Sequence, residues 1–274
     1  MHANSATRIS EDWPSKAAYA EGGILEKPAT PVGLSLTFVA GGRPSASDVE
    51  FLLQSEAVLG LGASITHRSE GSEGWLEILA SGLACDLVGL APAQGSRPPA
   101  AQFCFGLSRE DADAPCEAIT LLPGPHLQGG GAAMMPVVRT MAGLIASFAL
   151  HFPAQAVCWH PANTWMEPKY FARTVANWLS GGVFPALGLT AIEQVGEHGV
   201  RSCGLSFFTG QEVEVESRGE SSSAELVKLA IRVIDYLVSE GPLEAAMELQ
   251  GPAGEKLIAE PSRDSRLVRV WREA

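Results

Sequence analysis

The sequence predicts an α+β fold, with largely antiparallel sheets packed against a few helices and room for two lobes of similar size. The chain has 274 residues, of which 46% are hydrophobic and 18% charged, so it can bury a sizeable core. Short runs with apolar residues at alternate positions outnumber the helical patterns. The helical patterns also do not alternate one for one with the strands, as they do in a doubly wound parallel sheet.

The first half of the chain is dominated by predicted strands. Residues 1–30 are polar and interrupted by Pro and Gly, so we expect a flexible leader. Alternating apolar residues predict a strand at 34–39, and a helix follows with Ser45 or Ser47 as its N-cap. Further strands are predicted at residues 63–67, 75–80, 85–90, 102–107 and 118–122.

The second half contains the strongest helical patterns. Residues 132–152 are the most apolar stretch, but Pro136 and Arg139 interrupt it, and about 20 apolar residues are needed to cross a bilayer, so we expect a buried helix. Residues 221–239 show the i, i+3, i+4, i+7 apolar spacing of an amphipathic helix. The other predicted elements are a helix at 169–179, strands at 156–160, 183–195, 200–208, 213–216, 256–259 and 267–271, and a hairpin turn at 197–199.

The stretch 123–131, rich in Pro and Gly, is the best candidate for a domain boundary. A boundary there divides the chain after the leader into an N-terminal α+β lobe at 31–122 and a C-terminal α+β lobe at 132–274. The change in composition across it is small, so the sequence leaves open whether there are one or two domains.

Charge and cysteine usage exclude several classes of function. Lys and Arg number 19 against 31 Asp and Glu, a net charge of −12, which disfavours binding to nucleic acid or to an anionic membrane. The first 30 residues lack a signal-peptide pattern and the five cysteines are dispersed, so we expect reduced thiols and a cytoplasmic protein. No zinc spacing or phosphate-binding loop is present, so neither a metal nor another cofactor is expected, and the oligomeric state stays open.

Cys158 and His160 are the candidates for a catalytic pair. Alternate residues of a strand point to the same face, and a histidine close to a cysteine can generate the nucleophilic thiolate. Their Cβ atoms lie roughly 6–7 Å apart along a strand, which is long for a direct hydrogen bond. The sequence therefore favours a buried cysteine and a histidine at a strand end over a catalytic pair.

The acidic run Glu212, Glu214 and Glu216 is a candidate binding surface. Three carboxylates on one strand face can gather a hard cation. Acids that alternate with valines are also typical of a half-exposed strand, with the carboxylates toward water. The second interpretation is favoured.

Aromatic and basic residues supply two more candidate contact surfaces. Trp159 and Trp165 belong to an aromatic group that either stacks on a ligand or, as is more common, builds the core. Arg269 lies in a row of arginines near the end of the chain, which predicts a basic sheet edge. Such an edge either prevents unwanted strand pairing or docks an acidic partner. The row consists of Arg263, Arg266, Arg269 and Arg272.

One segment resembles a bacterial family. Residues 199–215 read GVRSCGLSFFTGQEVEV, and this pattern resembles the family called domain of unknown function 4261. The strand AVCWH at 156–160 and the helix that follows, with Glu167-Pro168 and Phe171, are also similar to that family. The resemblance covers residues 118–271, with a fainter echo at 34–90. Phe207-Phe208-Thr209 stands where the family pattern has a Phe-Gly step.

The resemblance implies no activity and no catalytic residue. Families of this general kind include immunity and partner-binding proteins of bacterial conflict systems. Together with the missing catalytic and cofactor motifs, this predicts a non-catalytic cytoplasmic module that binds a protein partner. The alternative is a cysteine-dependent hydrolase or transferase that uses Cys158 and His160, with Glu212 or Glu214 as the nearby carboxylate.

Overall fold

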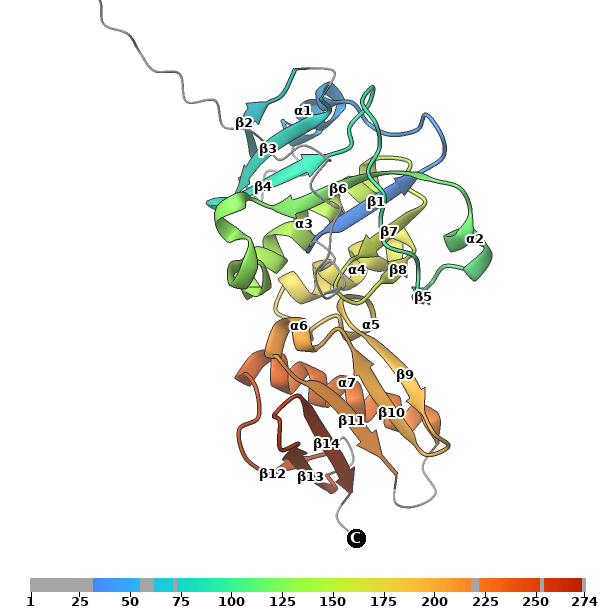
Figure 1. Cartoon of the computed structure of the whole chain (residues 1–274), viewed down its shortest axis with the longest axis vertical. Coiled ribbons are helices and arrows are strands. Elements are labelled where there is room, and N and C mark those ends of the chain that lie inside the picture. Colours follow the sequence, from blue (N-terminus) through green and yellow to red (C-terminus); the bar gives the residue numbers. More distant parts are fainter. Residues whose placement is uncertain (1–31, 55–61, 71–72, 218–221, 252–253, 273–274) are drawn as a thin grey trace, which may run out of the picture.

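The computed structural model contains two β-sheets, and each is packed against at least one helix (Figure 1). The structure describes residues 32–54, 62–70, 73–217, 222–251 and 254–272. The predicted leader at 1–30 therefore lies outside the described residues. The α+β prediction is confirmed, because both sheets are mostly antiparallel.

The first sheet has eight strands. In spatial order they are β2 (Ser64–Arg68), β3 (Trp75–Ala80), β4 (Leu83–Val88), β6 (Glu117–Pro123), β1 (Leu34–Phe38), β7 (Ala156–Trp159), β8 (Thr164–Met166) and β5 (Phe103–Phe105). Only β5 and β8 run parallel. The central strand β1 is buried along its whole length, because both faces of the sheet are covered there.

Helices cover one face of the first sheet. The apolar helix α3 (Met135–His151) lies across its central strands, and α4 (Pro168–Leu179) packs against α3 (Figure 1). The opposite face packs against the segment 91–116, which includes the short helix α2 (Arg109–Asp113). In the described part of the chain, α3 and the other helices are too short or too polar to span a bilayer.

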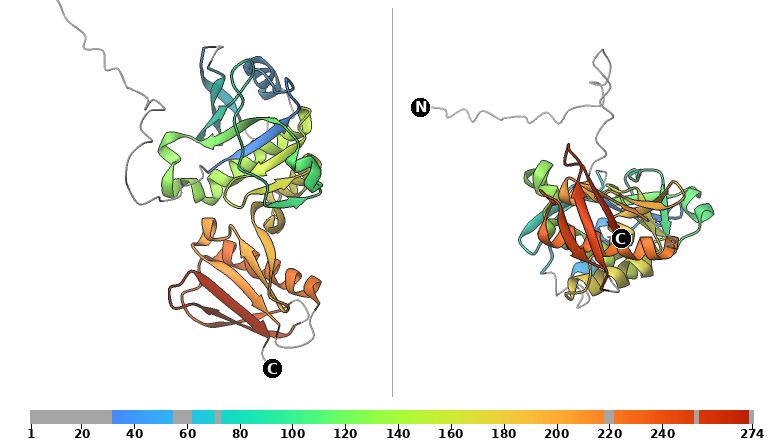
Figure 2. Two further views of the ribbon diagram at one scale, coloured as in Figure 1. Left: turned by 45° about the vertical axis from the view of Figure 1, so that its right-hand side comes forward. Right: turned by 90° about the horizontal axis from the view of Figure 1, so that it is seen from below.

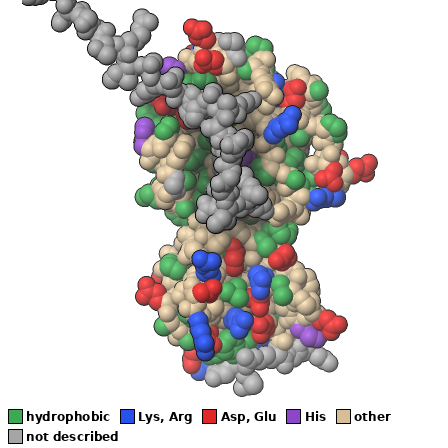
Figure 3. Space-filling view, viewed as in Figure 1, with side chains coloured by type: hydrophobic (Ala, Val, Ile, Leu, Met, Phe, Trp, Pro, Cys, Tyr) green, Lys and Arg blue, Asp and Glu red, His purple; other side chains and the backbone are tan. Residues whose placement is uncertain are grey.

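The second sheet has six strands and a single long helix, α7 (Ser223–Glu240). In spatial order the strands are β12 (Met247–Gln250), β13 (Lys256–Pro261), β14 (Leu267–Arg272), β11 (Glu212–Glu216), β10 (Gly199–Cys203) and β9 (Ala191–Val195). Figure 2 shows α7 lying along one face of this sheet. The other face carries interspersed basic and acidic side chains, visible in the lower part of Figure 3.

Serine residues cap two of the helices, and Ser45 is one of the two caps that the sequence predicts. Ser45 caps α1 (Ala46–Leu53), and Asp48 closes a capping box with it. Ser222 and Glu225 form the same arrangement at the start of α7. The caps satisfy backbone N–H groups that have no partner inside the helix, so they set where each helix begins.

The predicted domain boundary at 123–131 is wrong with respect to the sheets. Strands β6 and β7 lie on either side of it in the chain, yet both pair with β1 in the first sheet. The change from one sheet to the other comes later, after α4, where α5 (Ala186–Leu189) leads into β9. A loop rich in Gly and Pro marks a turn, but strand pairing across that turn decides the sheet to which each strand belongs.

The junction between the sheets is made by aromatic packing and a close backbone contact. Trp159 lies edge-on to Phe207 at 5.3 Å between ring centroids and stacks on Phe208 at 6.1 Å. Gly204 has a φ of +86°, and a Cβ there would lie 2.6 Å from the Cβ of Ala162. This glycine ends β10, so the predicted strand at 200–208 gives way to the short helix α6 (Ser206–Thr209).

Candidate functional site

Cys158 lies in an apolar cluster on the face of the first sheet that is turned away from α3. Its thiol is fully buried against Ala101, Ala156 and Trp165. Burial, and to a smaller extent the nearby Cys116, raises the pKa of the thiol far above its usual value. A thiol held in its protonated form is a weak nucleophile, so Cys158 has the environment of a structural cysteine.

His160 is held by a chain of hydroxyl groups. Its Nε2 lies 2.8 Å from Ser35 Oγ, and Ser35 Oγ lies 2.7 Å from Thr120 Oγ1. Ser96 Oγ continues the chain, since it lies 2.6 Å from Thr120 Oγ1 and 3.0 Å from the carbonyl oxygen of Ala118. Satisfying all four hydrogen bonds needs four protons, and the three hydroxyls supply only three. His160 Nε2 therefore donates to Ser35, so this nitrogen is not available to accept a proton from Cys158.

We expect Cys158 to be alkylated more slowly than Cys104 in the native protein. The raised pKa leaves less thiolate at any pH below it, and burial blocks the reagent, whereas Cys104 is only half-buried. The rates should differ by on the order of 100-fold at pH 8. Peptide mapping after timed iodoacetamide treatment measures both, with urea-unfolded protein as the control in which the rates converge. Equal native rates would contradict the burial.

The carboxylate of Glu212 binds a turn of the backbone. Its Oε1 accepts from the N–H groups of Gly204 and Ser206, each at 3.0 Å, and its Oε2 accepts from Leu205 N–H at 3.2 Å and from the Ser202 hydroxyl. Three successive N–H groups that point at one anion form a nest. Glu212 therefore fixes the segment between β10 and α6, at the junction of the two sheets.

Glu214 is buried and paired with Arg201 on the neighbouring strand β10. Both oxygens of Glu212 and one of Glu214 already accept hydrogen bonds from protein donors. These oxygens are therefore not available as ligands for the cation that the acidic run suggested. In the part of the chain that the structure describes, three or more His, Cys, Asp or Glu side chains nowhere gather in a way that could hold a metal ion. The expectation that these carboxylates face water is wrong for Glu214.

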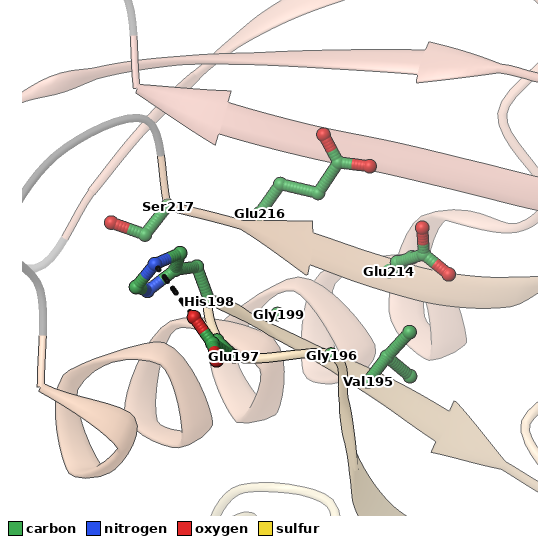
Figure 4. A pocket seen from close by; sticks show the side chains of 8 residues that line it. All are labelled: Val195, Gly196, Glu197, His198, Gly199, Glu214, Glu216 and Ser217. Carbon is green, nitrogen blue, oxygen red and sulfur yellow. Dashed lines mark ion pairs between the residues drawn. The ribbon is translucent and has the colours of Figure 1, made fainter.

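Glu216 borders a pocket of about 280 Å³ at the end of the second sheet (Figure 4). The pocket also contains the hairpin residues Glu197 and His198, whose side chains are exposed and 3.9 Å apart. Both side chains face solvent, and nothing in the pocket points to a ligand. The antiparallel pairing of β9 with β10 confirms the predicted hairpin turn between them.

The aromatic candidates form part of the interior. Trp159 and Trp165 are 0% and 5% exposed, so neither ring is a surface that a partner can reach. Trp165 donates its indole N–H to the carbonyl oxygen of Pro99 at 3.1 Å. The core interpretation of these aromatics is therefore confirmed, and their assignment as binding residues is wrong.

The basic sheet edge is also a wrong prediction. Arg269 lies on β14, which is an interior strand between β13 and β11. Its register partners are Glu260 and Glu214, so it belongs to a row of alternating charges across the uncovered face of the sheet. The true edges of the second sheet are β12 and β9. The row of alternating charges continues to β9, where Glu193 is the register partner of Arg201.

A groove that the sequence did not reveal lies beside the edge strand β12. It has a volume of about 310 Å³ and separates β12 from the outer side of α7. Tyr236 and Arg232 contribute from α7, and the half-buried Met247 and Leu249 contribute from β12. The sequence MELQ is too short and too polar to predict a strand.

The backbone of β12 offers free hydrogen-bonding groups on its outer side. Gly251 N–H donates to the carbonyl oxygen of Glu255 at 2.8 Å, so this is a hydrogen-bonded position of the hairpin between β12 and β13. Such positions alternate along an antiparallel pair, which makes Leu249 and Met247 the residues bonded to β13. The N–H and C=O groups of Glu248 therefore point away from β13, and those of Gln250 do the same.

Comparisons with known proteins found no match to a family model, a curated protein or a solved structure. The resemblance of residues 199–215 to domain of unknown function 4261 therefore stays a prediction. The candidate site with the best support is the groove beside β12, since the catalytic and aromatic candidates are buried or already hydrogen-bonded.

Proposed function

We propose that this protein is a non-catalytic binding module that holds an extended segment of a partner protein against β12. The observation that carries the proposal is the outward-facing backbone of Glu248 and Gln250 beside the groove along α7. An added strand would gain main-chain hydrogen bonds from β12 and pockets for alternate side chains from the groove.

The groove also suggests the composition of the partner segment. Met247, Leu249 and Tyr236 form an apolar floor, which suits apolar side chains at alternate positions of the added strand. Arg232 is exposed at this groove and has no ion pair or hydrogen bond with another described residue. An acidic side chain on the partner would pair with it, so we expect an apolar strand that carries at least one acid.

The other sheet edges are less suited to strand addition. The outer strand β5 has only three residues. On β2, Arg68 forms an ion pair with Glu50, and on β9 the side chain of Gln194 accepts a hydrogen bond from Ser223. Short strands and charged side chains protect sheet edges from pairing. β12 is itself short and carries the ion pair of Glu248 with Lys256, so it is the groove beside this strand that makes it the preferred edge.

The location and biological role belong to the same proposal. The five cysteines are free thiols, which supports a reducing, cytoplasmic location. The resemblance at 199–215 supports a bacterial partner-binding role of the immunity type. No observation in the described structure favours the cysteine-dependent hydrolase or transferase.

We expect Glu248→Pro to weaken partner binding about tenfold relative to Glu248→Ala, because proline lacks the outward N–H that the partner strand would use. Both variants remove the exposed ion pair between Glu248 and Lys256, so that loss cancels in the comparison. Proline is tolerated on an edge strand where its nitrogen faces away from the neighbouring strand. Peptides selected from a displayed ten-residue library on the full-length protein provide the ligand, and titration calorimetry gives the affinities.

The selection itself is the first check, since the enriched peptides should alternate apolar residues and contain an acid. Thermal midpoints of the two variants should agree, which shows that the β12–β13 pairing is intact. A selection that yields no enriched pattern contradicts the proposal. Equal affinity of the selected peptides for the proline and alanine variants also contradicts it.

A further inference from the structure

A third hollow lies at the junction of the two sheets, away from β12. It has a volume of about 360 Å³, within the range of pockets that hold small molecules. The first sheet contributes the segment between β7 and β8, with His160, Pro161 and Asn163. The second contributes Ser206 and Phe207 from α6, so the pocket exists only where the two parts meet.

Asn163 brings an unsatisfied polar group to this pocket. Its Oδ1 is buried and has no hydrogen-bond partner, which is uncommon for a buried polar atom. Its backbone has a φ of +50°, a conformation that asparagine tolerates better than most residues. The terminal torsion of an asparagine is soft, so the carboxamide can turn either end toward the pocket. Across the junction, the Ser206 hydroxyl has no hydrogen-bond partner among the described residues.

The lining carries no formal charge from Asp, Glu, Lys or Arg among its described residues, and its two ring side chains are held in place. His160 is fixed through Nε2 by Ser35, and its ring packs against Gly33, where a Cβ would lie 3.3 Å from its Cε1. Phe207 is fixed by its edge-on contact with Trp159. A charged ligand would lose its hydration without a counter-charge, so the pocket suits a neutral molecule.

We propose that this junction pocket binds a small neutral molecule that carries a carboxamide, or an equivalent donor–acceptor pair, on a flat apolar ring. The carboxamide pairs with the amide of Asn163, which has both a donor and an acceptor to offer. The ring lies against Phe207, and the Ser206 hydroxyl provides a further hydrogen bond. Because the pocket uses different residues from the groove beside β12, this inference does not depend on the proposed partner.

The test uses benzamide as the probe, with benzoate and toluene as matched compounds. Benzoate keeps the ring but is charged and has no donor, and toluene keeps only the ring. In a nuclear magnetic resonance titration of the full-length labelled protein, benzamide should shift the amide signals of Asn163 and Ser206 and saturate with a Kd on the order of 1 mM. Benzoate and toluene should bind about tenfold more weakly or worse, because benzoate lacks the donor and carries a charge without a counter-charge, and toluene has no hydrogen-bonding group.

Asn163→Gly removes the carboxamide and keeps a residue that accepts a positive φ, so the fold should persist while benzamide affinity falls about tenfold. His198→Ala, on the exposed hairpin of the second sheet, is the control that should leave affinity unchanged. If the glycine variant loses its fold, Ser206→Ala carries the same comparison. The proposal is overturned if benzamide fails to saturate, if toluene binds as tightly, or if neither pocket variant lowers the affinity.

Discussion

Replacing Gly204 with alanine is expected to lower the thermal midpoint of the protein by roughly 6–12 °C, which corresponds to about 3 kcal/mol. Two costs combine at this position. A non-glycine residue at a φ of +86° is strained by about 1–2 kcal/mol. The new Cβ would also lie 2.6 Å from the Cβ of Ala162, and overpacking of this kind costs about 1–3 kcal/mol.

Gly210 provides a matched control for the backbone strain. Its φ is +76°, but a Cβ there meets nothing within 4 Å, so Gly210→Ala carries the strain without the clash. The difference between the two variants therefore measures the contact between the sheets. We also expect the unfolding transition of the Gly204 variant to broaden, because that contact couples the two parts. Equal midpoints for the two variants would show that the close approach is relieved at no cost.

Most of the elements could be predicted from local patterns, because alternation and capping are properties of neighbouring residues. The strand at β1 and the helix α7 follow directly from apolar spacing. The assignment of strands to sheets could not be predicted in this way. β7 returns to pair with β1 across more than a hundred residues, and no signal in residues 123–131 distinguishes a domain boundary from a turn within one sheet.

The candidate sites could be predicted only in part for the same reason, because they depend on contacts between residues that are far apart in the sequence. The alternation of residues along β7 correctly places Cys158 and His160 on one face, but burial by the segment 91–116 and the hydrogen bond to Ser35 depend on other parts of the chain. The spacing of Glu212 and Glu214 likewise says nothing about the backbone turn and the arginine that take up their charges. No sequence pattern points to Asn163 or to the β12 groove. Each site is formed by elements that are distant in the sequence, α6 in the first case and α7 in the second.

Glu212→Gln is expected to destabilise the protein by about 3 kcal/mol, since hydrogen bonds to a charged group contribute about 1.5–3 kcal/mol each and unsatisfied donors add a further cost. Glutamine has one acceptor oxygen in place of two, and its NH₂ group would face N–H donors of the turn. Gly204, Leu205 and Ser206 would then compete for a single oxygen. Urea unfolding of the variant and of the wild type measures the change in free energy.

Glu216→Gln is the control, because Glu216 is on the same strand and half-buried but accepts no hydrogen bond from a described residue. It should change stability by no more than about 0.5 kcal/mol. The two variants separate the nest from a general effect of lowering the negative charge. The turn that Glu212 holds also carries Ser206 and Phe207, so its loosening should weaken benzamide binding in the junction pocket as well. A Glu212→Gln protein that is as stable as the Glu216 variant would mean that the three N–H groups find other acceptors.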